Sequence, residues 1–280
     1  MEIYELNKMA TQVRRDILRM VSAAHSGHPG GAMSCADYIV DVFFSQMNVK
    51  PENFSMEGKG EDVFYLSNGH VCPALYSVLA RKGYFDTSEL ATLRALGSRL
   101  QGHPSTSHNL PGIRIASGSL GQGLSVAVGH ALEKKMSGDK SMVYSLHGDG
   151  ELQEGQIWEA AMFAAAHHVD NIISAIDNNN QQIDGRVDDV ISLGNLKGKW
   201  EAFGWYALSC DGNNISSIED TLAQAKQHIG QGQPIVIILN TKMGYGVDFM
   251  LDDNKWHGTV PDDEQLERAL GMLEETLGDY

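Results

Sequence analysis

The sequence predicts an α/β fold in which a mostly parallel sheet carries helices on both faces. Short runs rich in β-branched residues alternate along the chain with longer segments of helical periodicity, as expected for a parallel sheet. Glycine and proline fall between these segments, where turns are expected, and are not gathered into a linker. No internal repeat or low-complexity segment interrupts the alternation. A single domain spanning residues 1–280 is the simplest prediction.

The apolar patterns place the elements in order along the chain. Strands are predicted at 63–67, 113–117, 142–146, 172–177, 206–210 and 235–240. Helices are predicted at 7–24, 34–46, 73–82, 121–136, 156–168, 215–229 and 262–276. Between Ile157 and Ala165 apolar residues recur at intervals of three and four, so we expect that helix to pack by one face.

Length and composition are typical of a globular protein with a sizeable core. The chain has 280 residues, of which 42% are hydrophobic and 20% charged. Its formal net charge of −15 argues against binding to nucleic acid or anionic membranes, because both need clustered Lys and Arg. A phosphate ligand in so acidic a protein would need a metal ion, a helix N-terminus or a few placed cations to hold it.

The cysteines and the N-terminal segment indicate a cytoplasmic protein. Cys35, Cys72 and Cys210 form no CxxC pair and are expected to be reduced and mostly buried. The N-terminal segment is charged throughout and lacks the apolar core of a signal peptide. No run approaches the ~18 apolar residues that a membrane span requires.

Polar residues follow two of the predicted strands. Gly148-Asp149-Gly150 comes after the strand at 142–146, and Asn178-Asn179-Asn180-Gln181 comes after the strand at 172–177. Ligands of open α/β sheets bind outside the carboxyl ends of the strands. Each motif alone is ordinary turn chemistry. Together they offer a carboxylate and an amide side by side, which are hard oxygen ligands suited to Mg²⁺ or Ca²⁺ rather than Zn²⁺.

Four histidines sit in loops bounded by glycine or proline, namely His28, His70, His103 and His257. Imidazole suits proton transfer near neutral pH, although a lone histidine is more often structural. His25 and His28 imitate a zinc-binding pair, but no further ligands have suitable spacing. No role is assigned to the other histidines, which are His25, His108, His130, His147, His167, His168 and His228.

Several short blocks recur in a recognisable order along nearly the whole chain. They are SGHPGG at 26–31, FYLSNGH at 64–70, QGHP at 101–104, GSLGQGLSVAVG at 118–129, GDGELQEG at 148–155, DNNNQQIDG at 177–185 and WHG at 256–258. GDG followed at this distance by NN resembles the signature of thiamine-diphosphate enzymes. Taken together, the blocks resemble the transketolase family, and they imply its diphosphate-binding (PP) domain over residues 1–280.

The resemblance implies thiamine diphosphate and Mg²⁺ as cofactors, with Ca²⁺ or Mn²⁺ able to substitute for Mg²⁺. Asp149 and Asn179 would be metal ligands together with the backbone carbonyl of Gln181, and two diphosphate oxygens and a water would complete an octahedron. Gly150 would contact the diphosphate. The metal would neutralise the diphosphate within an acidic protein.

Further residues match the family's cofactor site. His70 would contact the diphosphate, while Gly118, Ser119 and Leu120 would line the thiazolium ring. Lys242 would help to hold the diphosphate or the substrate, although a solvated loop lysine is nearly as good an interpretation.

The resemblance also assigns catalytic and interface roles. His103 would hold the terminal hydroxyl of the donor sugar, and His28 and His257 would lie beside the hydroxyls where the carbon–carbon bond breaks. His257 is also counted with the cofactor-binding residues. Glu154 matches a glutamate at the subunit interface, or else provides a negative charge at a helix N-terminus.

The implied reaction is transfer of a two-carbon ketol unit from a ketose to an aldose. The family's pyrimidine-binding domain, with the glutamate that activates the cofactor, matches nothing in this sequence. We therefore expect an N-terminal subunit that works with a C-terminal partner subunit, forming an α₂β₂ tetramer. The substrate would be a small anionic sugar: a pentose phosphate by default, or a sulfo-sugar or a branched sugar phosphate.

Three alternatives remain beside this hypothesis. A subunit similar to 1-deoxyxylulose-5-phosphate synthase shares the GDG and NN motifs, but SGHPGG, LSNGH and WHG favour transketolase. A non-catalytic regulatory homologue would retain the same residues by descent. A nicotinamide-dependent oxidoreductase would explain strand, glycine-rich turn and acid, but the glycines run GxxGxG and the acid comes too late for a Rossmann motif.

Overall fold

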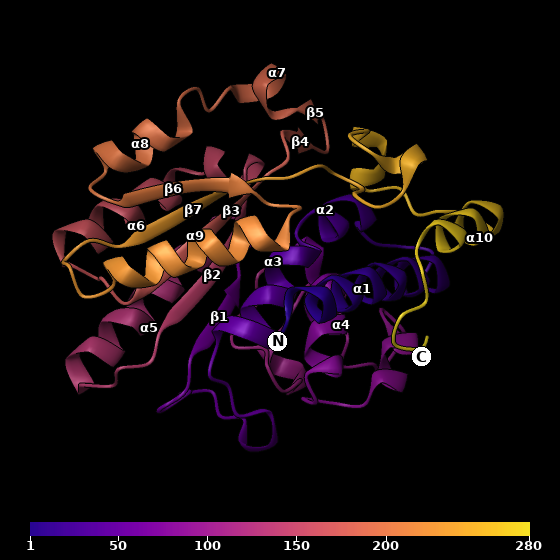
Figure 1. The fold of residues 1–280 in the computed structure, drawn as a ribbon, viewed down its shortest axis with the longest axis horizontal. Coiled ribbons are helices and arrows are strands. Elements are labelled where there is room, and N and C mark those ends of the chain that lie inside the picture. Colours follow the sequence, from indigo (N-terminus) through magenta and orange to yellow (C-terminus); the bar gives the residue numbers. More distant parts are fainter.

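The computed structural model describes residues 1–280 and contains a five-stranded sheet flanked by helices (Figure 1). The sheet order is β1-β2-β3-β7-β6 and every pairing is parallel, which confirms the predicted α/β class. Its strands are β1 (Val63–Leu66), β2 (Val143–Gly148), β3 (Ile172–Asn178), β6 (Tyr206–Asp211) and β7 (Ile235–Asn240). A small antiparallel pair follows β3, made of β4 (Gln181–Gln182) and β5 (Gly185–Arg186).

The central strands are apolar throughout because helices cover both faces of the sheet. In β2, Val143 belongs to one hydrophobic core and the next residue, Tyr144, to the other. One core includes residues of α1 (Ile3–Ala23), α3 (Ala36–Asp41), α4 (Cys72–Arg81) and α9 (Ile215–His228). The opposite core includes residues of α5 (Gly123–Ser137), α6 (Gly155–Ala166) and α8 (Leu196–Ala202).

The remaining elements are short and lie mostly in the loops. The α-helices among them are α2 (Pro29–Ser34), α7 (Val187–Ile191) and α10 (Asp263–Met272), and η1 (Val42–Gln46) is a π-helix. The 3₁₀-helices are η2 (Pro51–Asn53), η3 (Gly69–Val71), η4 (Thr87–Thr92), η5 (Thr106–His108), η6 (Gly150–Gln153), η7 (Asp248–Met250) and η8 (Asn254–His257). None of the helices combines the length and apolar character that crossing a membrane requires.

The connections change sides of the sheet between β3 and β7. Helix α6 joins β2 to β3 and packs in one core, whereas α9 joins β6 to β7 and packs in the other. Such a change of side opens a crevice at the carboxyl ends of the strands in doubly wound folds. The register pairs Gly148 with Asp177, so the residues that follow β2 and β3 emerge side by side at this edge.

The strand predicted at 113–117 is wrong, because no strand forms there. β1 is an edge strand, and this segment does not pair with it. Side-chain contacts hold the segment instead, since Arg114 lies 2.6 Å from the carboxylate of Glu61. The Ser117 carbonyl packs against Gly69, where a Cβ would lie only 2.2 Å from it. The apolar residues of this segment indicate burial rather than strand pairing.

The helix predicted at 34–46 is broken into α3 and the π-helix η1, with α2 before it. Cys35 separates α2 from α3, and its backbone (φ −95°, ψ 3°) departs from helical values. Ser34 turns its hydroxyl toward Asp177 of β3, at 2.6 Å. This contact with the sheet competes with a continuous helix. The other predicted helices are present, although α1 begins at Ile3 and α10 ends at Met272.

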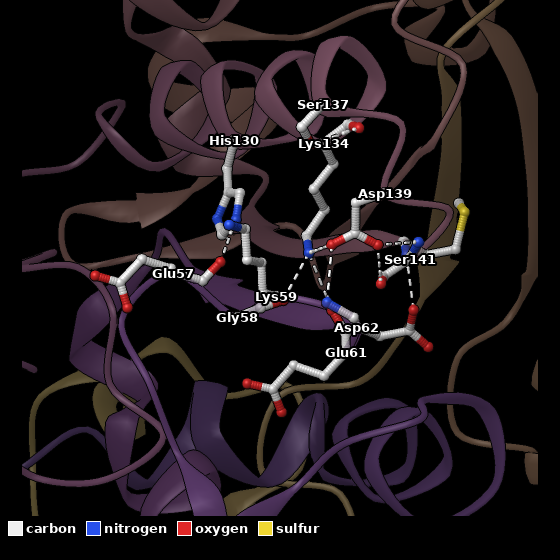
Figure 2. Close-up of polar contacts among 12 residues, drawn as sticks. Glu57, Gly58, Lys59, Glu61, Asp62, His130, Lys134, Ser137, Asp139 and Ser141 are labelled. Atoms are coloured by element: carbon white, nitrogen blue, oxygen red, sulfur yellow. Dashed lines mark hydrogen bonds and ion pairs between the residues drawn. The ribbon is translucent and has the colours of Figure 1, made fainter.

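A buried lysine fastens the loop before β1 to helix α5 (Figure 2). The Lys134 ammonium donates to the carbonyls of Gly58 (2.7 Å) and Glu61 (3.1 Å) and lies 3.0 Å from Asp139. Asp139 also accepts hydrogen bonds from Ser141, beside the start of β2. These contacts satisfy a charge that would otherwise be costly to bury.

Candidate active site

A pocket of about 420 Å³ lies where the segments after β1, β2 and β3 meet. Residues from at least five stretches of the chain line it, and most of them are polar. The lining residues are His28, Gly31, Asn68, His70, His103, Gly118, Leu120, Gly148, Asp149, Gly150, Glu151, Gln153, Glu154, Asp177, Asn179, Gln181, Gln182, Ile183 and His257. The pocket therefore occupies the edge of the sheet that the strand-end motifs predict.

Asp149 follows β2 and is almost completely buried. Its Oδ1 accepts a hydrogen bond from the backbone N–H of Gly150 (2.7 Å), and its Oδ2 accepts one from Asn180 (2.5 Å). Burial raises the pKa of Asp149 to about 8, and the neighbouring carboxylate of Asp177 adds to the rise. The two backbone contacts tie the end of β2 to the turn after β3.

Asp177 fixes the orientation of Asn179. The wholly buried Asp177 carboxylate accepts hydrogen bonds from the hydroxyls of Ser34 and Thr241 and from the Asn179 amide nitrogen (2.8 Å). The Asn179 nitrogen is thus engaged, while the amide oxygen accepts from the N–H of Gln181 at 2.9 Å. That oxygen keeps a second lone pair for a ligand. Burial raises the pKa of Asp177 to about 6.

The donor set fits a small divalent cation. Asp149, Asn179 and Gln181 bring a carboxylate, an amide oxygen and a backbone carbonyl to one pocket, and all three are hard oxygen ligands. No Lys or Arg lines the pocket to balance the buried carboxylates of Asp149 and Asp177. A cation would supply that missing charge and lower both pKa values.

Four histidines converge on the opposite side of the same pocket. The ring centroid of His28 lies 5.2 Å from that of His70, 6.1 Å from that of His103 and 5.6 Å from that of His257. His70 and His257 are 5.1 Å apart. They come from the start of α2, from η3, from η8 and from an irregular loop, so only the fold brings them together.

These imidazoles are neutral near pH 7. Burial lowers the pKa of His28 to about 4, and the neighbouring His257, His103 and Arg94 lower it further. Burial likewise lowers the pKa of His70, His103 and His257. A neutral imidazole offers one donor and one acceptor, which suits sugar hydroxyls.

Several polar atoms around the pocket have no partner within the chain. The Nδ1 atoms of His28 and His257 and the amide oxygen of Asn68 are buried without a hydrogen bond. Each belongs to a residue that lines the pocket. Because unpaired buried polar atoms are costly, their grouping around one cavity indicates a polar ligand with several hydroxyl or amine groups.

The structure gathers most of the residues singled out in the sequence. His28, His70, His103, Gly118, Leu120, Asp149, Gly150, Glu154, Asn179, Gln181 and His257 all line the pocket. Two do not. Ser119 is exposed beside it, and Lys242 lines a neighbouring hollow with Asp211, Asn213 and Tyr245 at the ends of β6 and β7. The seven histidines without an assigned role lie outside the lining.

Sequence reasoning missed three buried residues of this site. Asn68, Glu151 and Asp177 line the pocket and are almost fully buried. Each lies inside a motif block, directly beside a residue chosen for its chemistry or two positions from one. A polar residue within an otherwise buried strand end was the available signal. Arg94, also missed, donates to the Gly102 carbonyl (3.2 Å) next to His103.

The fold and the pocket define a parallel α/β domain that binds its ligand at the carboxyl ends of the strands. Residues 6–276 match a family model described as "Transketolase, thiamine diphosphate binding domain". The chain therefore belongs to the transketolase family, as the sequence motifs predict.

Similar curated proteins fall into two length classes. One of the two subunits of an apulose-4-phosphate transketolase of Actinobacillus succinogenes is 38% identical over 97% of this chain and 96% of its own length. A 6-deoxy-6-sulfo-D-fructose transketolase subunit of a Clostridium species is 38% identical over 96% of both chains. Human transketolase is 35% identical over 92% of this chain, but only 40% of its own length is matched.

Solved structures show the same relation. Transketolase from Campylobacter jejuni superposes with a TM-score of 0.89 at 33% identity, covering 98% of this chain and 43% of the other. Transketolase from Leishmania mexicana gives a TM-score of 0.89 at 26% identity and covers 42% of that chain. The chain thus spans less than half the length of these transketolases.

Proposed function

We propose that this chain is the cofactor-binding, N-terminal subunit of a two-chain transketolase. Residues 1–280 would form one diphosphate-binding domain, and the enzyme would transfer a two-carbon ketol unit from an anionic ketose to an aldose. The observation that carries the proposal is the meeting, in one pocket, of strand-end oxygen donors on one side and four neutral histidines on the other.

The oxygen donors would hold Mg²⁺ and, through it, the diphosphate. Asp149, Asn179 and the Gln181 carbonyl would ligate the metal, and Ca²⁺ or Mn²⁺ could replace it. The Gly150 backbone and His70 would contact the diphosphate, while Gly118 and Leu120 would pack against the thiazolium ring. Thiamine diphosphate supplies the nucleophile for carbon–carbon bond cleavage when bound. Lys242 lies in a separate hollow and is left without a role in this proposal.

The histidines would orient the sugar and move its protons. His28 and His257 have unpaired Nδ1 atoms and depressed pKa values, so each is available as an acceptor at neutral pH. Either would take the proton of the donor hydroxyl beside the bond that breaks, and His103 would hold the terminal hydroxyl. Closely packed neutral imidazoles keep this region free of fixed positive charge until a proton arrives.

The substrate would be a small anionic sugar. Arg94 is close enough to His28 and His103 to lower the pKa of both, so a positive charge lies beside the histidine cluster. Two relatives of similar length are named for apulose-4-phosphate and for 6-deoxy-6-sulfo-D-fructose, both of which are anionic. A pentose phosphate, a branched sugar phosphate and a sulfo-sugar are the candidates that follow.

The second subunit would supply what this chain lacks. The matched part of single-chain transketolases is about 40% of their length, and the similar short proteins are named as subunits. A C-terminal subunit carrying the pyrimidine-binding domain and its activating glutamate would close the cofactor site. We expect an α₂β₂ assembly in the cytoplasm, with Glu154 at the interface between sites.

The proposal is tested by assaying ketol transfer with this chain alone, with the isolated C-terminal subunit and with both, in the presence of thiamine diphosphate and Mg²⁺. We expect activity only from the pair. Full activity from this chain alone would refute the two-subunit proposal, and product formation from pyruvate instead would favour the 1-deoxyxylulose-5-phosphate synthase alternative. No activity with any ketose, despite a stable complex, would favour a regulatory homologue.

Replacing Asp149 separates the metal assignment from the rest. Asp149→Ala should weaken Mg²⁺-dependent binding of thiamine diphosphate to the reconstituted complex by about 100-fold or more, since even losing a supporting residue costs a metal site 10–100-fold. Asp211→Ala is the matched control, because Asp211 also ends a strand of the same sheet but lies outside the pocket. Equal affinities for the two variants, measured by calorimetry, would contradict the metal assignment.

A further inference from the structure

Glu151 lies beside the pocket and takes no part in the chemistry proposed above. It stands in η6, two positions after Asp149, and is almost completely buried although it is charged in its ordinary state. Buried carboxylates are retained only where donors satisfy them. Its partners therefore indicate what it does.

The Glu151 carboxylate receives hydrogen bonds from three segments of the chain. Its Oε1 accepts from the hydroxyl of Ser67 and from the backbone N–H of Gly121 (2.8 Å). Its Oε2 accepts from the backbone N–H of Gly148 (3.1 Å). The Ser67 oxygen in turn accepts from the N–H of Gly123 (3.0 Å). Glu151 and Ser67 thus act as one branched hydrogen-bonded unit.

Each of these segments leads directly into the pocket lining. Ser67 follows β1 and precedes Asn68 and His70, while Gly148 ends β2 and precedes Asp149. The 118–123 segment contains Gly118 and Leu120 and continues into α5. The 118–123 segment has no place in the sheet, so hydrogen bonds to side chains are its link to the strand ends.

The packing leaves no slack between these segments. A Cβ at Gly123 would lie 2.4 Å from the Ser67 side chain, a distance that real Cβ contacts do not show. The first turn of α5 is therefore pressed onto the end of β1. Hydrogen bonds at this contact set the position of the 118–123 segment to within a fraction of an ångström.

We infer that Glu151 is a positioning residue, which holds the 118–123 segment against the carboxyl ends of β1 and β2 and so fixes one wall of the pocket. The consequence for cofactor affinity rests on the proposed function; the structural statement does not. The wall that contains Gly118 and Leu120 would meet the thiazolium ring, whereas Asp149 and Asn179 would meet the metal and diphosphate.

A carboxylate is required because every partner that Glu151 faces is a donor. The N–H groups of Gly121 and Gly148 cannot accept, and the Ser67 oxygen is already accepting from Gly123. In Glu151→Gln the side-chain NH₂ would replace one acceptor and point at a donor, on whichever side it lies. The isosteric change therefore breaks part of the unit without altering side-chain volume.

Amide hydrogen exchange on the full chain without ligand tests the positioning role. We expect Glu151→Gln to speed exchange within 118–123 by about 10–100-fold, as losing a hydrogen bond to a charged acceptor implies. Ser67→Ala is a second variant, which removes the branch to Gly123 while leaving the carboxylate in place. It should expose the Gly123 amide more than that of Gly121.

A matched control distinguishes positioning from general loss of stability. Asp16 is also a wholly buried carboxylate that accepts a serine hydroxyl, from Ser77 at 2.6 Å, but it lies between α1 and α4 outside the pocket lining. Asp16→Asn should lower thermal stability without raising exchange selectively within 118–123. If Glu151→Gln and Asp16→Asn give the same exchange pattern in that segment, the positioning role is overturned.

A second readout connects the positioning role to the cofactor. In the complex with the C-terminal subunit, Glu151→Gln should raise the thiamine diphosphate concentration for half-maximal rate by about tenfold. The maximal rate at saturating cofactor should stay within about twofold, because no reacting group is lost. A wild-type complex that ignores thiamine diphosphate would refute the proposed function, while the exchange result would still decide the role of Glu151. Faster exchange with unchanged cofactor affinity would remove the functional consequence.

Discussion

At the scale of single residues, the pocket is shaped by how its buried carboxylates are satisfied. Asp177 is surrounded by hydroxyl and amide donors, Glu151 by backbone N–H groups and Ser67, and Asp149 by only two backbone N–H groups. Asp149 accordingly has a higher pKa than Asp177, about 8 against about 6. Among these three acids, it is the one whose environment most favours a cation as an additional partner.

Asp41 is a further buried acid, far from this chemistry, and it makes stability depend on pH. It ends α3 beside the π-helix and accepts only weak hydrogen bonds from Gln46, at 3.2 and 3.4 Å. Burial raises its pKa from the ordinary 3.8 to about 7. The folded state thus holds a proton that the unfolded state releases above about pH 4.

We predict that Asp41→Asn stabilises the protein at pH 8 but not at pH 4. A raised folded-state pKa gives stability that is present below the unfolded pKa and lost as the pH rises through about 7. An asparagine avoids that loss, so the free energy of unfolding should be about 1–3 kcal/mol higher in the variant at pH 8. Urea titrations of both proteins from pH 4 to 8 measure the difference. Parallel pH profiles would show that Asp41 is ionised in the folded state.

At the scale of elements, loops around the sheet depend on single charged side chains. The 57–62 loop lies against α5 through the ammonium of Lys134 and has no part in the sheet (Figure 2). Asp62, at its end, accepts the backbone N–H groups of Asn48 and Met142 at 2.8 and 2.7 Å. The loop therefore fixes where β1 starts alongside β2.

We predict that Lys134→Met destabilises the fold by about 3–5 kcal/mol, because it leaves two buried carbonyls and Asp139 without their donor. Lys135→Met is the control on the same helix. Lys135 is partly exposed and lies 2.7 Å from Asp170, so its loss should cost about 1 kcal/mol or less. Chemical denaturation compares the two, and similar losses would mean that burial of Lys134 contributes little.

Acid should reproduce part of the Lys134 effect. Burial by itself would raise the pKa of Asp139, but hydrogen bonds from Ser141, Gly60 and Lys134 outweigh it and hold that pKa well below its usual range. A depressed folded-state pKa gives stability that is present above the unfolded pKa and lost as the pH falls toward the folded value. The contribution of this cluster should therefore fade below about pH 4, near the ordinary pKa of an aspartate.

At the scale of the whole molecule, a pocket built from this chain alone is open on the side of its loops. Apolar side chains lie exposed there: Leu96 is fully exposed in the loop beside Arg94, and Ile183 is exposed although it lines the pocket. In a protein of net charge −15, exposed apolar residues next to a ligand site favour a partner surface. The proposed C-terminal subunit would cover them.

We predict that Leu96→Glu weakens association with the C-terminal subunit by about tenfold or more, since a charge would be buried at the interface. The melting temperature of the isolated chain should not change, because Leu96 has no contacts to lose within it. Met136→Glu is the control, at an exposed apolar residue of the last turn of α5, which precedes the opposite end of β2. Equal affinities for wild type and Leu96→Glu, by sedimentation or interferometry, would place the partner elsewhere.

The sequence by itself determined the parallel α/β class, five of the strands and the main helices. It also determined that Asp149 and Asn179 follow neighbouring strands, because local periodicity and turn chemistry are written in consecutive residues. Only the tertiary structure decided that 113–117 pairs with no strand, that the 34–46 helix breaks, and that Lys242 lies outside the pocket. Those outcomes, like the convergence of four histidines and the partners of Glu151, depend on contacts between segments distant in the chain. A pattern read along one segment carries no information about which other segment will face it.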